Sequence, residues 1–227
     1  MKYLSGNKVK LIALISMTID HIGRVFFPSL VIFEMIGRLS FPLFAYMIAE
    51  GWKYTSNRIR YFSIISVMGI FFQIIYYIMF SSLHMGVFIM YSLSLLFIYS
   101  IEFAISKKKY AFIFPLLTFL SIVLISGVEY IFPESSFAVD YGLIGILLPV
   151  AVYFSKTKID KLCYMCVLLC VLCIVYGGVQ FACLFSLIPL SYYNGERGTF
   201  KLKWFFYIYY PFHLIVIWGL NLLLFHV

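Results

Sequence analysis

Long apolar stretches separated by short polar segments dominate the chain. A helix needs about 20 mostly apolar residues to cross a bilayer, whereas a membrane strand shows alternating apolar and polar positions, which are absent here. Because lipid offers no partners to backbone polar groups, the pattern predicts an all-α polytopic bundle of transmembrane helices. The predicted helices lie at approximately 10–27, 31–51, 61–80, 85–105, 110–131, 139–155, 162–177, 179–193 and 204–225.

Basic residues in the polar segments orient the chain. With a cytoplasmic N-terminus, the outer segments receive Glu129, Glu134 and Asp140 and no basic residue, which is the bias of the positive-inside rule. Each of five inner segments then carries three Lys or Arg: Lys2, Lys8 and Lys10; Lys53, Arg58 and Arg60; Lys107, Lys108 and Lys109; Lys156, Lys158 and Lys161; and Arg197, Lys201 and Lys203.

The number of spans is about nine, within a range of roughly eight to ten. The seventh and eighth stretches are short and are separated only by Gly177 and Gly178, so residues 162–193 form either one span or two. Two spans are favoured, because a single span would put the last basic cluster on the opposite side of the membrane. The sequence therefore predicts a multi-pass protein of the cell (cytoplasmic or inner) membrane.

Composition agrees with this interpretation. Of the 227 residues, 64% are hydrophobic and 11% are charged, with a mean hydropathy of +1.02, whereas a soluble domain is about half apolar and roughly a quarter charged. Soluble, disordered and disulfide-scaffold classes are excluded. The net charge of +8 reflects orientation and contact with anionic membrane lipids, not binding of nucleic acid. We expect residues 1–227 to form a single integral-membrane domain.

Two basic residues, Arg24 and Arg38, lie inside apolar stretches. An ionisable group at membrane depth costs about 2.5–3.5 kcal/mol and marks function unless it is paired. Asp20 and Arg24, like Glu34 and Arg38, are four residues apart, which predicts ion pairs on a helix. These pairs either form a polar pocket between the first two helices or lock helix packing, and Arg24 is also placed to snorkel to the outer headgroups.

His21, beside Asp20, is the strongest candidate for chemistry, because an imidazole takes up and returns a proton near neutral pH. Lys10 precedes it by eleven residues, so both share one helix face about 16 Å apart. A molecule with phosphates at the inner surface and a reactive group on a long arm, such as acyl-coenzyme A, fits this spacing. A lysine is also common at the end of any span.

The cysteines do not predict a metal site. Cys163, Cys166, Cys170 and Cys173 would form one stripe about 15 Å long on a helix, which is too extended to converge on one ion. With Cys183 the count is odd and indicates no disulfide framework. We expect no metal cofactor.

Several blocks of the chain resemble the TraX family, named for a conjugative pilin acetylase. They occur in family order from one end of the chain to the other: Lys10–Pro28, Ile36–Gly51, Lys53–Arg60, Asp140–Leu147, Tyr193–Gly198 and Tyr209–Leu214. The first helices are also similar to acyltransferase family 3 and to lysosomal glucosamine N-acetyltransferases. In acyltransferase family 3 a basic residue precedes an essential histidine with ten residues between, and Lys10 and His21 match that spacing.

The resemblance implies a membrane acyltransferase with acetyl-CoA as acyl donor. The acceptor would be an amine or hydroxyl at or across the membrane, such as the N-terminus of a pilin or surface peptide, or a glycan. His21 would act as general base or covalent carrier, Asp20 would orient its ring, and Arg38 or Arg24 would stabilise the oxyanion.

Further residues receive roles from the same resemblance. The active-site wall would comprise Arg24, Glu34, Glu50, Tyr210 and His213. The phosphates of acetyl-CoA would be held by Lys10, Lys53, Arg58, Arg60 and Arg197. A homodimer is one option for assembly.

Two other functions stay open from the sequence. A small proton-coupled secondary transporter would use Asp20, His21 and Glu50 as a proton relay, and it predicts inverted repeats, which the sequence does not show. The other alternative is a noncatalytic membrane subunit that assists assembly of a surface structure.

Overall fold

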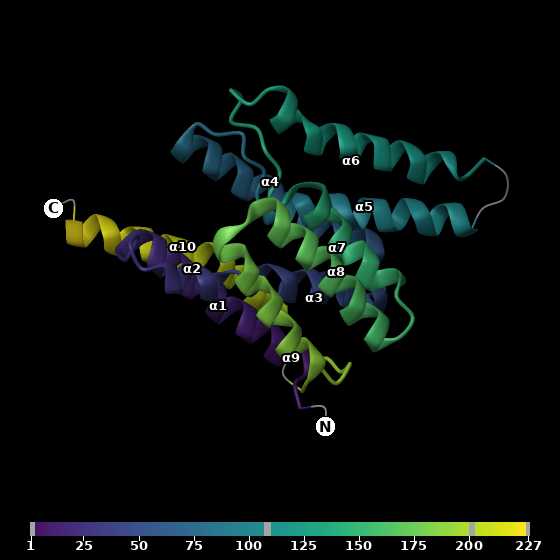
Figure 1. Cartoon of the computed structure of the whole chain (residues 1–227), viewed down its shortest axis with the longest axis horizontal. Helices are drawn as coiled ribbons and strands as arrows, with labels where there is room; N and C mark the ends of the chain where they lie inside the picture. The colour runs from purple at the N-terminus through teal and green to yellow at the C-terminus, as the bar shows by residue number, and fades with distance from the viewer. Residues whose placement is uncertain (1–2, 107–109, 200–202, 226–227) are drawn as a thin grey trace. The chain divides into compact units, whose positions relative to one another are not determined.

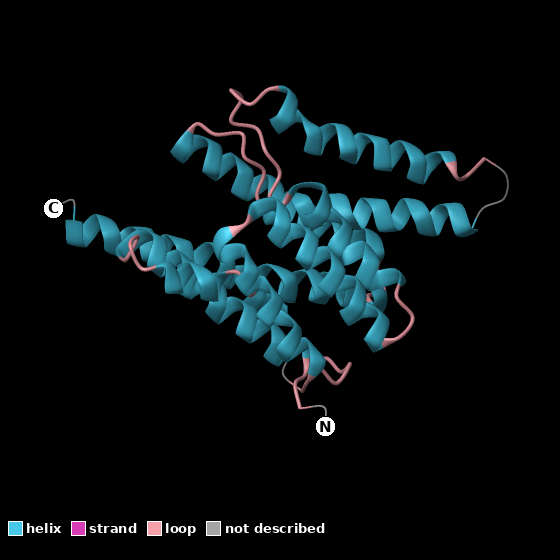
Figure 2. Cartoon of the chain, viewed as in Figure 1, coloured by secondary structure: helices cyan, strands magenta, loops and turns pink. Residues whose placement is uncertain are grey.

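The computed structural model describes residues 3–106, 110–199 and 203–225. Within these ranges every extended regular element is a helix, as Figure 2 shows, which confirms the predicted all-α class. The helices are α1 (Gly6–Phe26), α2 (Val31–Gly37), α3 (Ser40–Tyr54), α4 (Arg58–Phe80), α5 (Val87–Ser106), α6 (Ile113–Ile131), α7 (Gly142–Phe154), α8 (Lys158–Tyr176), the 3-10 helix η1 (Gly178–Ser186), α9 (Leu187–Ser191) and α10 (Lys203–Phe225).

Two of the predicted stretches are irregular. The second is interrupted after Gly37, and α3 resumes at Ser40, whose hydroxyl donates to the Gly37 carbonyl at 2.8 Å. The eighth follows Gly177 and Gly178, both at positive φ, and forms η1 and the short α9 rather than one regular helix. Glycine adopts that backbone region without steric cost, so the two glycines end α8 and start a new direction.

Five helical segments are long and apolar enough to cross a membrane: Val31–Tyr54, Arg58–Phe80, Val87–Ser106, Ile113–Ile131 and Lys158–Tyr176. They support the prediction of a membrane protein. Helix α7, with 13 residues, rises only about 20 Å, which is shorter than the hydrocarbon core of about 30 Å. The count of nine spans and the cytoplasmic N-terminus stay predictions.

The chain forms two compact units. The first combines residues 1–47 with 169–227, and the second comprises residues 48–168. In the first unit α1 packs against α2 and α10, and α2 contacts η1 (Figure 1). Gly23 and Gly37 let α1 and α2 approach closely, since a Cβ at Gly23 would overlap Phe33 and one at Gly37 would overlap Asp20.

In the second unit α5 is central and packs against α4, α6 and α7, with α5 and α6 side by side in Figure 1. Met90, Leu95 and Ile98 of α5 and Ile146 of α7 are fully buried. The Ser94 hydroxyl donates to the Ile146 carbonyl at 2.8 Å. Small hydroxyl residues at such contacts let membrane helices approach and hydrogen-bond across the interface.

The two ends of the second unit differ in charge. At the end that we call the loop end, the segments 81–86 and 132–141 meet: the Met85 N–H donates to Ala138 at 2.7 Å, and the Asp140 N–H donates to Met85 at 3.0 Å. At the other end of α5, Arg58 reaches Glu102. We call this end, where Lys53 and Arg58 line a pocket with Glu102, the basic end. Its position on the inner side of the membrane stays a prediction.

Candidate active site

A pair of histidines joins α1 to α10 in the first unit. Nδ1 of His21 lies 2.9 Å from Nε2 of His213, with the ring centroids 5.1 Å apart and the ring planes inclined by 29°. His213 is only 4% exposed, whereas His21 is half-buried. The structure thus brings together two of the predicted site residues that are far apart in sequence.

Tyr209 supports this pair from one turn earlier on α10. Its ring stacks on His213 with centroids 5.3 Å apart, and its carbonyl lies 2.9 Å from Nδ1 of His213. The Thr18 hydroxyl donates to Leu14 at 2.8 Å, so the Tyr209 hydroxyl donates to Thr18, also at 2.8 Å. Tyr209 was missed as a site residue, although its position four residues before His213 places both on one helix face.

Tyr210, a predicted wall residue, also contacts His213, with an edge-on arrangement of the rings and centroids 5.6 Å apart. Contacts between α1 and α10 follow the same order in both helices, so the helices run in the same direction. These contacts are Lys10 with Phe206, Thr18 with Tyr209, and His21 with His213.

Asp20 lies on a different face of α1, against α2. Its Oδ2 is 2.9 Å from Nε of Arg24, which confirms the predicted i,i+4 ion pair. Its Oδ1 is buried and has no hydrogen-bond partner among the described residues. Adjacent residues of a helix point about 100° apart. The His21 ring, which Asp20 was expected to orient, instead contacts His213 through Nδ1.

Glu34 and Arg38 form the second predicted ion pair, across one turn at the end of α2. The side chain of Arg38 is largely buried, whereas that of Arg24 is more than half exposed. Both predicted ion pairs are therefore present, and both border the contact between α1 and α2.

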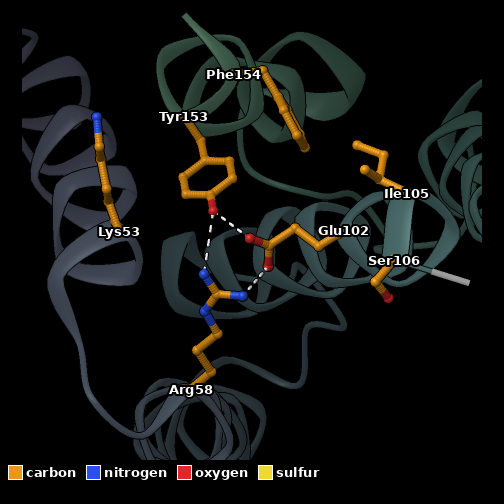
Figure 3. Close-up of a pocket in the computed structure, with 7 residues that line it drawn as sticks. All are labelled: Lys53, Arg58, Glu102, Ile105, Ser106, Tyr153 and Phe154. Atoms are coloured by element: carbon orange, nitrogen blue, oxygen red, sulfur yellow. Dashed lines mark hydrogen bonds and ion pairs between the residues drawn. The ribbon is translucent and has the colours of Figure 1, made fainter. Parts of the chain in front are cut away.

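The second unit contains a pocket of approximately 430 Å³ at its basic end, shown in Figure 3. Two of the residues expected to hold phosphate, Lys53 and Arg58, line it. The other lining residues are Glu102, Ile105, Ser106, Tyr153 and Phe154.

Glu102 is the centre of a hydrogen-bond network in this pocket. Its carboxylate accepts from Arg58 at 2.8 Å and from the Tyr153 hydroxyl, as Figure 3 shows. It also accepts from the indole of Trp52 at 3.1 Å. The Arg58 guanidinium also lies 5.6 Å from the Trp52 ring centroid. Arg58 is therefore already neutralised. Glu102 was missed, although it is the one acid within the apolar stretch 85–105.

Glu50, expected in the active-site wall, forms a buried ion pair with Lys161 in the second unit. The side chains are 8% and 9% exposed. The prediction that Lys161 lies in an inner loop is wrong in detail, since it lies in the first turn of α8 and turns inward to Glu50.

The remaining predicted phosphate ligands are Lys10, Arg197 and Arg60. Lys10 and Arg197 lie at one end of the first unit, because the backbone N–H of Asn7 in the first turn of α1 donates to the Arg197 carbonyl at 3.0 Å. Arg60 is exposed in the first turn of α4, where its N–H is capped by Asn57. Helix α1 is continuous from Lys10 to His21, as the predicted spacing of about 16 Å requires.

The cysteine stripe lies on one continuous helix, α8, as expected. Among the described residues, no group of three or more His, Cys, Asp or Glu side chains is arranged to hold a metal ion.

Comparison with known proteins places the chain in a family. No solved structure matches it. The protein named "Uncharacterized protein RP591" of Rickettsia prowazekii (strain Madrid E) is 27% identical over 191 residues, which cover 82% of this chain and 68% of that protein. A family model described as TraX protein matches residues 5–221. Because this match runs through α1, α10 and nearly everything between them, the chain belongs to the TraX family.

Proposed function

We propose that this membrane protein is an acyltransferase that moves an acetyl or similar acyl group from cytoplasmic acetyl-CoA to an acceptor at or across the cell (inner) membrane. The observation that carries the proposal is the contact of 2.9 Å between His21 and the buried His213. Membership of a family named for a pilin acetylase supports it. A neutral imidazole held in this way is suited to accept a proton or an acyl group.

The chemistry has two routes that use the same residue. In the direct route, the acceptor nitrogen or oxygen attacks the thioester carbonyl, the carbon–sulfur bond breaks, and His21 passes the acceptor's proton to the departing thiolate. In the covalent route, a ring nitrogen of His21 attacks the thioester carbonyl, the carbon–sulfur bond breaks and the thiolate leaves. The acceptor then attacks the acyl-imidazole, the carbon–nitrogen bond breaks, and the freed imidazole passes the acceptor's proton to the thiolate. In both, Arg38 or Arg24 would stabilise the negative oxygen that forms during attack.

For the acyl donor, Lys10 and Arg197 are the proposed phosphate ligands in the first unit. They lie at one end of it, and Lys10 is about 16 Å along α1 from His21, which a long flexible arm can span. In the second unit, Lys53, Arg58 and Arg60 are the proposed ligands at the basic end. Because Glu102 already pairs with Arg58, we expect Lys53 to contribute more to phosphate binding there.

The acceptor that we propose is a peptide N-terminal amine, as on a pilin or surface peptide, or a glycan hydroxyl. Mass spectrometry of surface and secreted material from a deletion strain would identify it by the loss of one acetyl group, about 42 Da.

The activity is tested with purified protein in lipid nanodiscs and radiolabelled acetyl-CoA, by following release of free coenzyme and labelling of peptide and glycan acceptors. His21→Ala is expected to lose at least about 100-fold in rate. The control is His84→Ala, which removes a histidine of the loop end. Unchanged activity in folded His21→Ala would overturn the role of His21. Proton uptake without any acyl transfer would favour the transporter.

A further inference from the structure

The hydrogen bonds around the two histidines determine which nitrogen carries each proton. The Tyr209 carbonyl only accepts, and it lies 2.9 Å from Nδ1 of His213, so in neutral His213 the proton is on Nδ1. Nε2 of His213 then carries a lone pair. Since that Nε2 lies 2.9 Å from Nδ1 of His21, the His21 nitrogen must donate, and Nδ1 of His21 holds its proton.

From this chain of donors and acceptors, and resting on the proposed acyl transfer, we infer that His213 is a positioning residue which keeps the reactive lone pair on Nε2 of His21. His213 does so as the acceptor that a carboxylate supplies in many histidine sites. Among the described residues, no hydrogen-bond partner occupies Nε2 of His21, so this nitrogen is the one left to take a proton or an acyl group.

The surroundings hold the acceptor in place. His213 is buried and contacts the rings of both Tyr209 and His21, and the Tyr209 hydroxyl is anchored to Thr18 on α1. The ring of His213 is thus held by stacking on Tyr209 and by a hydrogen bond at each nitrogen. A ring flip would place a carbon against the Tyr209 carbonyl and leave that carbonyl without the ring N–H.

A neutral acceptor has a chemical consequence. When His21 takes a proton at Nε2, both of its nitrogens carry protons, and Nδ1 still donates to His213. Because the acceptor His213 is neutral, it does not stabilise the protonated His21 as a carboxylate would. His21 therefore gives the proton up more readily than it would with a carboxylate partner. That property suits a residue that must return a proton to a thiolate within each turnover.

Two substitutions distinguish the role of His213 as a hydrogen-bond acceptor from its role as an aromatic ring. His213→Phe keeps an aromatic ring and removes the acceptor, whereas His213→Gln keeps an oxygen that can accept from His21. We expect His213→Phe to lower kcat by about 100-fold or more with little change in KM for acetyl-CoA. We expect His213→Gln to recover to within about tenfold of the natural protein. Equal activity of His213→Phe and the natural protein would overturn the inference.

A second readout does not depend on catalysis. Nitrogen-15 NMR of histidine-labelled protein in nanodiscs distinguishes protonated from unprotonated ring nitrogens, and His21→Asn assigns the signal among the four histidines. We expect His21 to be protonated at Nδ1 in the natural protein and in Tyr209→Phe, which keeps the carbonyl, and to shift toward the other tautomer in His213→Phe. A proton on Nε2 of His21 in the natural protein would overturn the inference. Absence of acyl transfer with the expected tautomer would instead reject the proposed function alone.

Discussion

Nε2 of His84 lies 2.8 Å from Oδ1 of Asp140, and this contact joins the loop after α4 to the loop before α7 at the loop end of the second unit. The hydrogen bond to Asp140 raises the pKa of His84 above its ordinary value of 6.5, against the opposing effect of burial. The negative charges of Asp140 and Glu129 act in the same direction as the hydrogen bond. Both partners are about one-third exposed, so solvent weakens the pair.

This pair predicts that the loop end loosens as pH rises. Because the pKa of His84 is raised in the folded state, the pair with Asp140 contributes its full stabilisation to the fold below pH 6.5. That stabilisation is lost as the pH rises through the higher pKa of the folded state. We expect less than about 1 kcal/mol, given the exposure. Hydrogen exchange of residues 81–86 and 132–141, corrected for the intrinsic effect of pH, measures it.

His84→Gln and Asp140→Asn serve as matched variants for that experiment. Each should remove the pH-dependent step in protection of both loops, while Ser121→Ala in α6, whose hydroxyl bonds only its own helix, should retain it. A pH-dependent step of equal size in His84→Gln would show that another group is responsible.

Close packing of α1 on α2 predicts that Gly37→Ala is destabilising. A Cβ at this position would overlap the Cβ and carboxylate of Asp20. The Cβ of Asp20 is fixed by its backbone, so it cannot move aside as the end of a long side chain could. We expect a loss of about 1–3 kcal/mol, typical of overpacking, measured by thermal unfolding in one detergent. The helical Gly127 has open space around it, so Gly127→Ala should be neutral or slightly stabilising. Equal behaviour of the two variants would contradict the close contact.

Much of the fold follows from local pattern. The apolar stretches predict the helices, and the four-residue spacing predicts the pairs Asp20–Arg24 and Glu34–Arg38, because both depend on residues within one turn. The break after Gly37 was not predicted, since residues 31–51 form one mostly apolar stretch in sequence and the tight approach to Asp20 comes from another helix.

The site was only partly predictable, because most of its contacts join residues that are far apart in sequence. His213 was singled out by family resemblance and not by spacing, because its partner His21 is 192 positions away. Glu102 was not singled out from the sequence, and Lys161 was placed in a loop. Their partners, Arg58 and Glu50, are brought to them only by tertiary packing.

The buried pair of Glu50 and Lys161 predicts strong coupling between the two positions. Removing one partner leaves a buried charge and is expected to cost about 3–5 kcal/mol, whereas apolar residues at both positions are often tolerated. Glu50→Leu and Lys161→Met should therefore each destabilise the protein, and the double variant should be more stable than either. Thermal unfolding of the four proteins in one detergent gives the coupling energy.

The same double variant tests the role of Glu50 in the active-site wall. A stable double variant that transfers acetyl groups normally would assign Glu50 to structure alone. A stable variant without activity would assign it to the site. Additive effects of the two single substitutions would show that the ion pair is not energetically coupled.

The charge difference between the ends of the second unit predicts its topology in the membrane. Ser56 lies between α3 and α4 at the basic end, and Ser135 lies in the loop that follows α6 at the acidic loop end. By the positive-inside rule the basic end is cytoplasmic. In a variant without the five natural cysteines, an impermeant maleimide added to intact cells should label Ser135→Cys and spare Ser56→Cys. In permeabilised cells both cysteines should be labelled.

Labelling of Ser56→Cys alone in intact cells would reverse the orientation. Labelling of both in intact cells would contradict the separation of the two ends, since α5 connects them as one continuous helix.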